Sequence, residues 1–199
     1  MYLFSYYTPW MLAQRYSHDL TRISEVEVDL RNVMRILWEQ HIAWTRMTII
    51  SIIKDLPDVD FVTKRLLQNP TDFKKVLQPF YGEEIASQFS DLFKNHLVIA
   101  AQLVKAAKAG YSKEAADAEK RWYANADEIA AFLGRINPYW SQEIWKKMLY
   151  EHLAMTKSEA VNILTNKYEE SIIEYDEIEN QALKMADMMA EGIVKQFSY

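Results

Sequence analysis

The chain contains no cysteine, and only four glycines and five prolines occur among its 199 residues. The lack of cysteine excludes disulfides, thiolate metal sites and cysteine nucleophiles. The glycines are isolated from one another, so no glycine-rich loop is present to hold a phosphate group. No serine lies in a Gly-x-Ser-x-Gly motif, which removes the commonest signature of a serine nucleophile.

The sequence also lacks a basic excess and a long apolar run. Its formal net charge is −5, which argues against nucleic-acid binding, because that function normally requires a basic surface. No run of about 18 uncharged apolar residues occurs, so a membrane-spanning helix is not expected. The N-terminus lacks the basic start and small-residue cleavage site of a signal peptide, so we expect a cytoplasmic protein.

Hydrophobic residues make up 50% of the chain, as expected of a globular protein. Apolar residues recur every three or four positions from Ser24 to Phe197, which predicts an all-α fold. The predicted helices cover residues 24–55, 58–79 with an interruption at 69–70, 82–109 and 112–134, one that begins at 137, and 166–197. Because the connections are short, we expect a bundle of about six helices arranged as three antiparallel hairpins.

Residues 1–23 are predicted to form a leader segment in front of a bundle domain, residues 24–199. The leader is rich in aromatic side chains, and Thr8-Pro9 is typical of a helix start, so a short helix to about Leu20 is predicted. Aromatic segments are seldom left in water. We therefore expect the leader to pack on the bundle or to join the subunits of a homo-oligomer.

Three of the four histidines recur at nearly equal intervals. His41, His96 and His152 are 55 and 56 residues apart, and each lies on the apolar stripe of a predicted helix. The similar segments Arg65–Asn69 and Arg121–Asn125 each end 27 residues before the next histidine. A fixed period of this kind is the signature of an internal repeat. Each predicted hairpin should therefore place one imidazole in a common interior.

Other polar residues lie at offsets that would bring them close to the histidines. Asn69, Asn125 and Glu179 follow the three histidines by 28, 29 and 27 residues, on the second helix of each predicted hairpin. Thr45 and Thr156 follow their histidines by four residues, one turn along the same helix face. These side chains are candidates for binding a small ligand or cofactor.

Three histidines and one carboxylate, from Glu159 or Glu179, would suit a divalent transition metal such as zinc or iron. Glu159 follows His152 by seven residues, which is two turns along the same face. The asparagines and threonines would then orient the histidines through hydrogen bonds. None of the short metal-binding motifs, such as His-x-x-x-His or Glu-x-x-His, is present.

The leading hypothesis is a helical-bundle protein with a buried site for a metal ion or a small ligand. Two alternatives stay open. A histidine on an apolar helix face is often a structural residue with its own hydrogen-bond partner, which would fit an interaction or scaffold protein. A metal-bound water at an open coordination position would instead make the protein a hydrolase. The residues therefore leave open whether it is an enzyme.

The segment Leu30–Arg46 has the pattern Leu-Arg-x-x-Met-Arg-x-Leu-Trp-Glu-x-His-x-x-Trp-Thr-Arg. It resembles the opening of a family of small all-helical prokaryotic proteins of unassigned activity, and the similarity continues through residues 125–130, 137–140 and 192–197. Members of that family are often labelled acetylglutamate kinase. A kinase of that kind would show alternating strands and helices with glycine-rich phosphate loops, and this sequence has neither. The resemblance implies the helical fold and supplies no catalytic residues.

Overall fold

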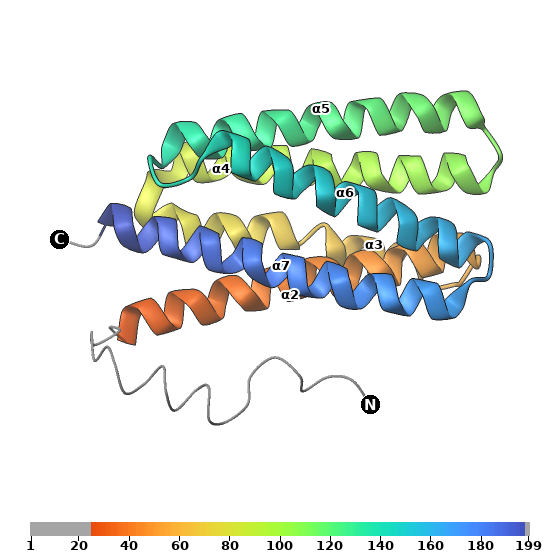
Figure 1. The fold of residues 1–199 in the computed structure, drawn as a ribbon, viewed down its shortest axis with the longest axis horizontal. Coiled ribbons are helices and arrows are strands. Elements are labelled where there is room, and N and C mark those ends of the chain that lie inside the picture. The colour runs from red at the N-terminus through yellow and green to blue at the C-terminus, as the bar shows by residue number, and fades with distance from the viewer. Residues whose placement is uncertain (1–24, 198–199) are drawn as a thin grey trace.

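The computed structural model describes residues 25–197, which form an all-α bundle (Figure 1). About 90% of these residues are helical and none of them lies in a strand, so the predicted fold class is confirmed. The helices are α2 (Glu25–Ile53), α3 (Val59–Leu66), α4 (Asn69–Lys108), α5 (Ser112–Ile136), α6 (Gln142–Leu164) and α7 (Tyr168–Phe197). None of the helices in this range could span a lipid bilayer. The predicted leader helix lies outside the described residues.

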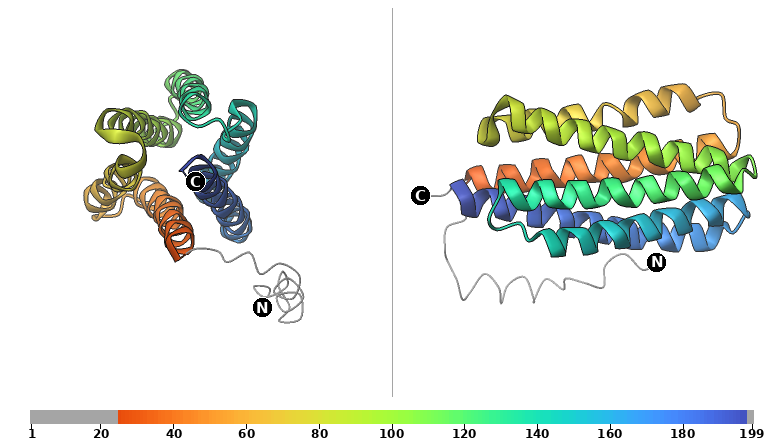
Figure 2. Two further views of the ribbon diagram at one scale, coloured as in Figure 1. Left: turned by 90° about the vertical axis from the view of Figure 1, so that its left-hand side faces the viewer. Right: turned by 90° about the horizontal axis from the view of Figure 1, so that it is seen from above.

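The chain runs up and down the long axis of the bundle. Helix α3 and the first part of α4 return along α2, and the chain then reverses inside α4 so that its second part pairs with α5 (Figures 1 and 2). Helices α6 and α7 form the last hairpin, and α7 packs against α2. Seen along the axis, the helices surround a common interior (Figure 2). The three antiparallel hairpins predicted from the sequence are therefore present.

Gly82 makes the reversal inside α4. Its backbone has φ 81° and ψ 168°, a conformation that residues with a Cβ rarely adopt. The sequence pattern predicted one helix ending near residue 79 and another starting at 82, and the turn lies at that boundary. The sequence predicts a second interruption at residues 69–70. In the structure it falls slightly earlier, between the end of α3 at Leu66 and the start of α4 at Asn69.

Helix α6 begins five residues later than the predicted start at residue 137. The backbone of Asn137 is extended, and its Oδ1 accepts a hydrogen bond from the amide of Tyr139 at 2.8 Å. This side-chain-to-backbone bond stabilises a turn in competition with a helix. The helix starts only after Ser141, whose hydroxyl accepts from the amide of Ile144 at 3.4 Å.

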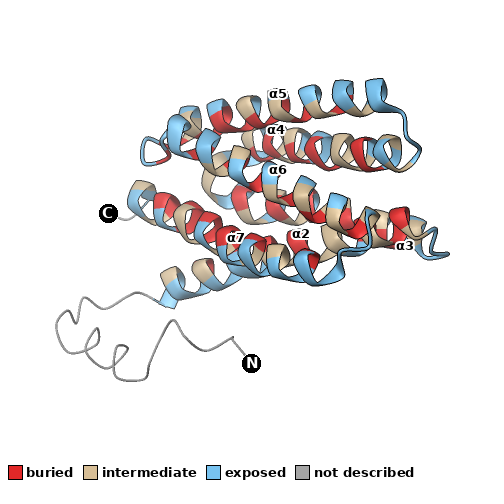
Figure 3. Cartoon of the chain, turned by 45° about the vertical axis from the view of Figure 1, so that its right-hand side comes forward, coloured by how far each residue is buried: buried red, intermediate tan, exposed pale blue. Residues whose placement is uncertain are grey.

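Buried residues lie on the helix faces that are turned toward the interior (Figure 3). Near the turn between α5 and α6, the interior is filled by large side chains, and Trp140, Trp145 and Phe73 are each no more than 1% exposed. We call this region the packed end. A Cβ on Gly192 would lie 1.9 Å from the indole Nε1 of Trp140, so glycine is what allows this tryptophan to pack against α7.

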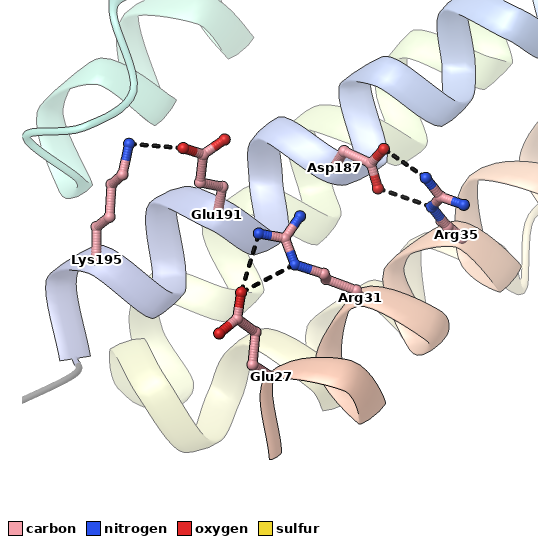
Figure 4. A network of polar contacts seen from close by, with 6 residues as sticks. All are labelled: Glu27, Arg31, Arg35, Asp187, Glu191 and Lys195. Carbon is pink, nitrogen blue, oxygen red and sulfur yellow. Dashed lines mark hydrogen bonds and ion pairs between the residues drawn. The ribbon is translucent and has the colours of Figure 1, made fainter. Parts of the chain in front are cut away.

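An ion pair on the outer surface connects α2 to α7, and a second pair lies beside it within α2. Arg35 donates from Nε and Nη2 to the two carboxylate oxygens of Asp187 at 2.7 and 2.6 Å (Figure 4). Arg31 pairs with Glu27 one turn earlier on its own helix at 3.0 Å. Exposed pairs of this kind contribute at most about 1 kcal/mol each. The contact between α2 and α7 therefore depends mainly on the buried side chains.

Candidate functional site

The three regularly spaced histidines lie in one interior. His41 of α2, His96 of α4 and His152 of α6 are 2%, 3% and 3% exposed, and all three line one small void of about 10 Å³. The ring centroids of His41 and His152 are 5.5 Å apart. Phe93 lies between His41 and His96. Its ring centroid is 4.9 Å from that of His41 and 6.3 Å from that of His96. We call the three histidines the histidine layer.

The same amide contact recurs beside each histidine. In every hairpin, an amide N–H on the returning segment donates to the main-chain carbonyl that lies four residues before the histidine. The three donor–acceptor pairs are Asn69–Leu37, Asn125–Leu92 and Gln181–Met148, at 2.9, 3.1 and 2.9 Å. Because each amide replaces water at a carbonyl in the interior, the contact ties the two helices of a hairpin together at the histidine layer.

In the second and third hairpins, the amide oxygen also binds the imidazole. Asn125 Oδ1 lies 2.9 Å from His96 Nδ1, and Gln181 Oε1 lies 3.1 Å from His152 Nδ1. Since the amide nitrogens are already used as donors, these oxygens are acceptors and Nδ1 carries the proton in both rings. His96 Nε2 then accepts a hydrogen bond from the indole N–H of Trp122 at 3.1 Å. Both ring nitrogens of His96 are therefore occupied by protein partners.

The first hairpin keeps the amide contact and lacks the second bond. His41 Nδ1 and Asn69 Oδ1 are both buried, and neither has a hydrogen-bond partner within residues 25–197. His41 is instead surrounded by rings, with Trp38 edge-on at a centroid distance of 5.7 Å. The first hairpin is thus the least hydrogen-bonded part of the histidine layer.

Burial keeps the three imidazoles neutral. Desolvation lowers the pKa of His96 to about 3, with a further lowering from His152. Desolvation also lowers the pKa of His152 to about 4, although its bond to Gln181 acts in the opposite direction. The pKa of His41 is held well below its usual value by desolvation and then by its two histidine neighbours. A positive charge in this layer would be buried without a counter-ion.

Glu159, one of the two predicted carboxylate ligands, points elsewhere. Its side chain is buried and forms an ion pair with Arg46 of α2. Arg46 Nη1 also donates to the carbonyl and the hydroxyl of Ser171, at 3.2 and 3.1 Å. Burial raises the pKa of Glu159 to about 7, against the lowering effect of Arg46. The Arg46 guanidinium therefore joins α2 to α6 and α7, and it holds the Glu159 carboxylate in place of a metal or an imidazole.

Glu179, the other predicted carboxylate, lies beside Glu39 of α2. Partial burial and then the neighbouring Glu179 raise the pKa of Glu39. The position next to His152 that the sequence assigned to Glu179 is occupied by Gln181, two residues later. The offset of 29 residues between His152 and Gln181 equals that between His96 and Asn125. The equal offsets could have identified Gln181 from the sequence. Glu179 was chosen instead because a carboxylate is a better metal ligand than an amide.

Within the described part of the chain, no group of three or more His, Asp or Glu side chains is placed so that it could hold a metal ion. The Nδ1 atoms of His96 and His152 bind amide oxygens, and the two carboxylates lie with other partners. The zinc or iron site that the sequence suggests therefore stays a prediction.

A cavity of about 380 Å³ lies on the side of the histidine layer opposite the packed end. Its floor is formed by Thr45, Ala100 and Thr156, each of which follows a histidine by four residues, one helical turn. Its walls come from α2, α4, α5 and α6, with Leu66 of α3, and consist mainly of alanine, isoleucine, leucine and valine. We call it the end cavity. Two of the four residues predicted to bind a ligand, Thr45 and Thr156, line it.

The end cavity reaches solvent at a mouth that is bordered by α5 and α6. Ala116 of α5 and Val161 of α6 line the cavity and are exposed to solvent. Lys157 Nζ binds both carboxylate oxygens of Glu119 at 2.6 and 2.7 Å, which connects the two helices at this mouth. These are the charged side chains among the described lining residues, and they neutralise each other.

No protein-family model matches the chain, and neither a curated protein nor a solved structure matches it. The resemblance to a family of all-helical prokaryotic proteins therefore stays a prediction, and function is argued from the histidine layer and the end cavity alone.

Proposed function

We propose that this protein binds a small apolar molecule in the end cavity, and that the adjacent histidine layer has a structural role. The volume and lining of the cavity carry this proposal. Small-molecule sites are concave, mainly apolar and about 300–1,000 Å³ in volume, and the end cavity has about 380 Å³ with a largely aliphatic lining. Protein interiors otherwise contain few voids larger than a water molecule, so a ligand would restore packing that the helices alone leave incomplete.

We also infer that the three hairpins are copies of one structural unit. The histidine spacing of 55 and 56 residues and the recurring amide-to-carbonyl bond support this. On this view the repeated unit supplies the stable frame. The positions one turn beyond the histidines differ between the units, as Thr45, Ala100 and Thr156, and this difference shapes the floor of the cavity.

Hydrogen-bonded histidines also fit the alternative of an interaction or scaffold protein. His96 in particular uses both ring nitrogens for contacts within the chain. Ligand binding is therefore the property that separates the two hypotheses, because a scaffold protein has no need of an internal cavity with an open mouth.

Titration with N-phenylnaphthylamine, a neutral fluorophore that brightens in apolar surroundings, tests the proposal. Ala160 lines the end cavity on α6, and Ala160→Phe would fill part of it. Ala154 is an exposed residue of the same helix, so Ala154→Phe is the matched control. We expect saturable binding by the wild type and by the control, and at least a tenfold loss of affinity in Ala160→Phe. Absence of binding by the wild type, or equal binding by all three proteins, would contradict the proposal.

A further inference from the structure

The end cavity has a polar side that is formed by α2. Thr45 and Thr48 both line it, and they lie three residues apart, on neighbouring turns of one helix face. The hydroxyl oxygens of both side chains are buried, and neither has a hydrogen-bond partner within residues 25–197. Elsewhere the lining next to these two residues is aliphatic, with Ile49 and Leu97 beside them.

A buried hydroxyl without a partner destabilises the folded state, because it has lost its hydrogen bonds to water. Threonine in a helix divides between two χ1 rotamers, so both hydroxyls can turn from their buried positions toward the cavity. A single ligand atom that accepts or donates hydrogen bonds then satisfies them together. The aliphatic remainder of the wall has no such requirement. The position of the two hydroxyls therefore orients a ligand, with its polar group at α2 near the floor and its apolar part toward the mouth.

The charges around the cavity determine what kind of polar group fits. Lys157 and Glu119 line the mouth and are paired with each other. Arg46 adjoins Thr45 in sequence, but its guanidinium is held by Glu159 and Ser171. No described cation is left over at the floor to compensate an ionised head group, and an uncompensated buried charge is strongly unfavourable.

We propose that the ligand of the end cavity is a neutral amphiphile, with one uncharged hydroxyl or carbonyl group bound by Thr45 and Thr48 and a hydrocarbon chain that extends toward the mouth. This inference rests on the function proposed above. From Thr45 to Ile53, the last residue of α2 to line the cavity, the helix rises about 12 Å, which matches the length of a medium-chain alcohol such as n-decanol.

The experiment measures how n-decanol and decanoate displace N-phenylnaphthylamine at pH 7 from the wild type, Thr45→Val and Thr48→Val. Valine has nearly the same shape as threonine and removes only the hydroxyl. Thr71→Val, at an exposed position of α4, is the matched control. We expect n-decanol to bind the wild type at least tenfold more tightly than decanoate. Each cavity variant should lose about tenfold in n-decanol affinity, the equivalent of one hydrogen bond, and should keep its affinity for the dye.

Thermal unfolding without ligand provides a second measurement. Since neither hydroxyl has a partner to lose, Thr45→Val and Thr48→Val should melt no lower than the Thr71→Val control. If the dye binds while n-decanol affinity is the same in all four proteins, the polar head group is wrong and the cavity function stands. Tighter binding of decanoate than of n-decanol would overturn the neutral head group in favour of an ionised one. If the wild type binds no dye, the proposed function itself fails.

Discussion

The two ends of the bundle are built from the same helices and differ in the size of the side chains between them. The packed end is filled by tryptophan and phenylalanine side chains, among them Trp145 and Phe73. The end cavity is lined by small residues, which include Ala100, Ala101 and Ala160. Because one set of helices extends through both ends, their spacing is fixed by the large side chains and the small ones cannot close the gap. Under the proposed function, stability and binding depend on opposite halves of one fold.

The histidine layer separates these halves, and it explains how they remain distinct. Three amide side chains bind main-chain carbonyls at this level and hold each hairpin together there. A layer with fixed hydrogen bonds resists the collapse of the hollow half, because moving one helix inward would break a buried bond.

Lowering the pH should have the largest effect on the free energy of unfolding, because it favours protonation of the three buried histidines between the two ends. The folded-state pKa values of His96 and His152 are about 3 and about 4, and that of His41 is also well below normal. Between about pH 6.5 and pH 4, the unfolded chain binds protons that the folded chain does not, so stability falls as pH falls. With three histidines, the expected loss is several kcal/mol over this range.

Glu159 acts in the opposite direction. Its folded-state pKa of about 7 lies above the unfolded value, so protonation below pH 7 favours the folded state and offsets the contribution of about one histidine. Urea unfolding at pH 7, 5.5 and 4.5 measures the net effect. An unfolding free energy that is constant or rises over this interval would show that the three imidazoles are not held neutral.

A single added methyl group should strongly destabilise the packed end. In Gly192→Ala, the new Cβ would clash with the indole of Trp140, and overpacking of this severity costs about 3 kcal/mol. The better helix propensity of alanine would return only about 1 kcal/mol. Glu191→Ala, at the exposed neighbouring position, should change stability by less than about 0.5 kcal/mol. Similar melting temperatures for the two variants would mean that Trp140 has room to move.

Replacing histidines by leucine should distinguish the hairpins within the histidine layer. His96→Leu leaves Asn125 Oδ1 and the Trp122 indole N–H without partners, at a cost of about 2–3 kcal/mol. His41→Leu loses no bond at Nδ1, since that atom has no partner among the described residues, and should cost about 1 kcal/mol or less. Chemical denaturation of both variants at pH 7.5 compares them. Equal losses would indicate that the amide bonds to the imidazole contribute little.

The smallest expected effect comes from enlarging one alanine at each end of the bundle, which should change stability in opposite directions. Ala160→Leu adds volume inside the end cavity and should stabilise the protein by about 1 kcal/mol through buried apolar surface. Ala190 of α7 is 0% exposed, so Ala190→Leu should destabilise by about 1–3 kcal/mol. Differential scanning calorimetry of both variants provides the comparison. Destabilisation by both would show that the hollow end is as tightly packed as the other.

The helices and the shared histidine interior could be predicted because they depend on periodicity. Apolar residues at intervals of three or four give the helices, and the spacing of His41, His96 and His152 gives the common depth. The position of Gln181 was equally readable from its offset. It was missed because a carboxylate two residues away, Glu179, suited a metal site better than an amide did.

The end cavity could not be predicted in the same way. Alanines such as Ala101 and Ala160 fit the core stripe of a helix whether or not the opposite wall reaches them. Whether small residues draw helices together or leave a space depends on the distance that other layers impose. The pairing of Arg46 with Glu159 could not be predicted from the sequence either, since it depends on how α2 and α6 are rotated about their axes.

Xenon binding tests most directly the central claim, that one end of the bundle is hollow and the other is packed. Xenon enters dry apolar cavities and is located by its scattering in crystals kept under pressure. The account predicts a xenon site among Ile49, Leu97 and Ala160, and none against Trp140 or Phe73 in the packed end. An end cavity without xenon, or xenon bound equally at both ends, would contradict it.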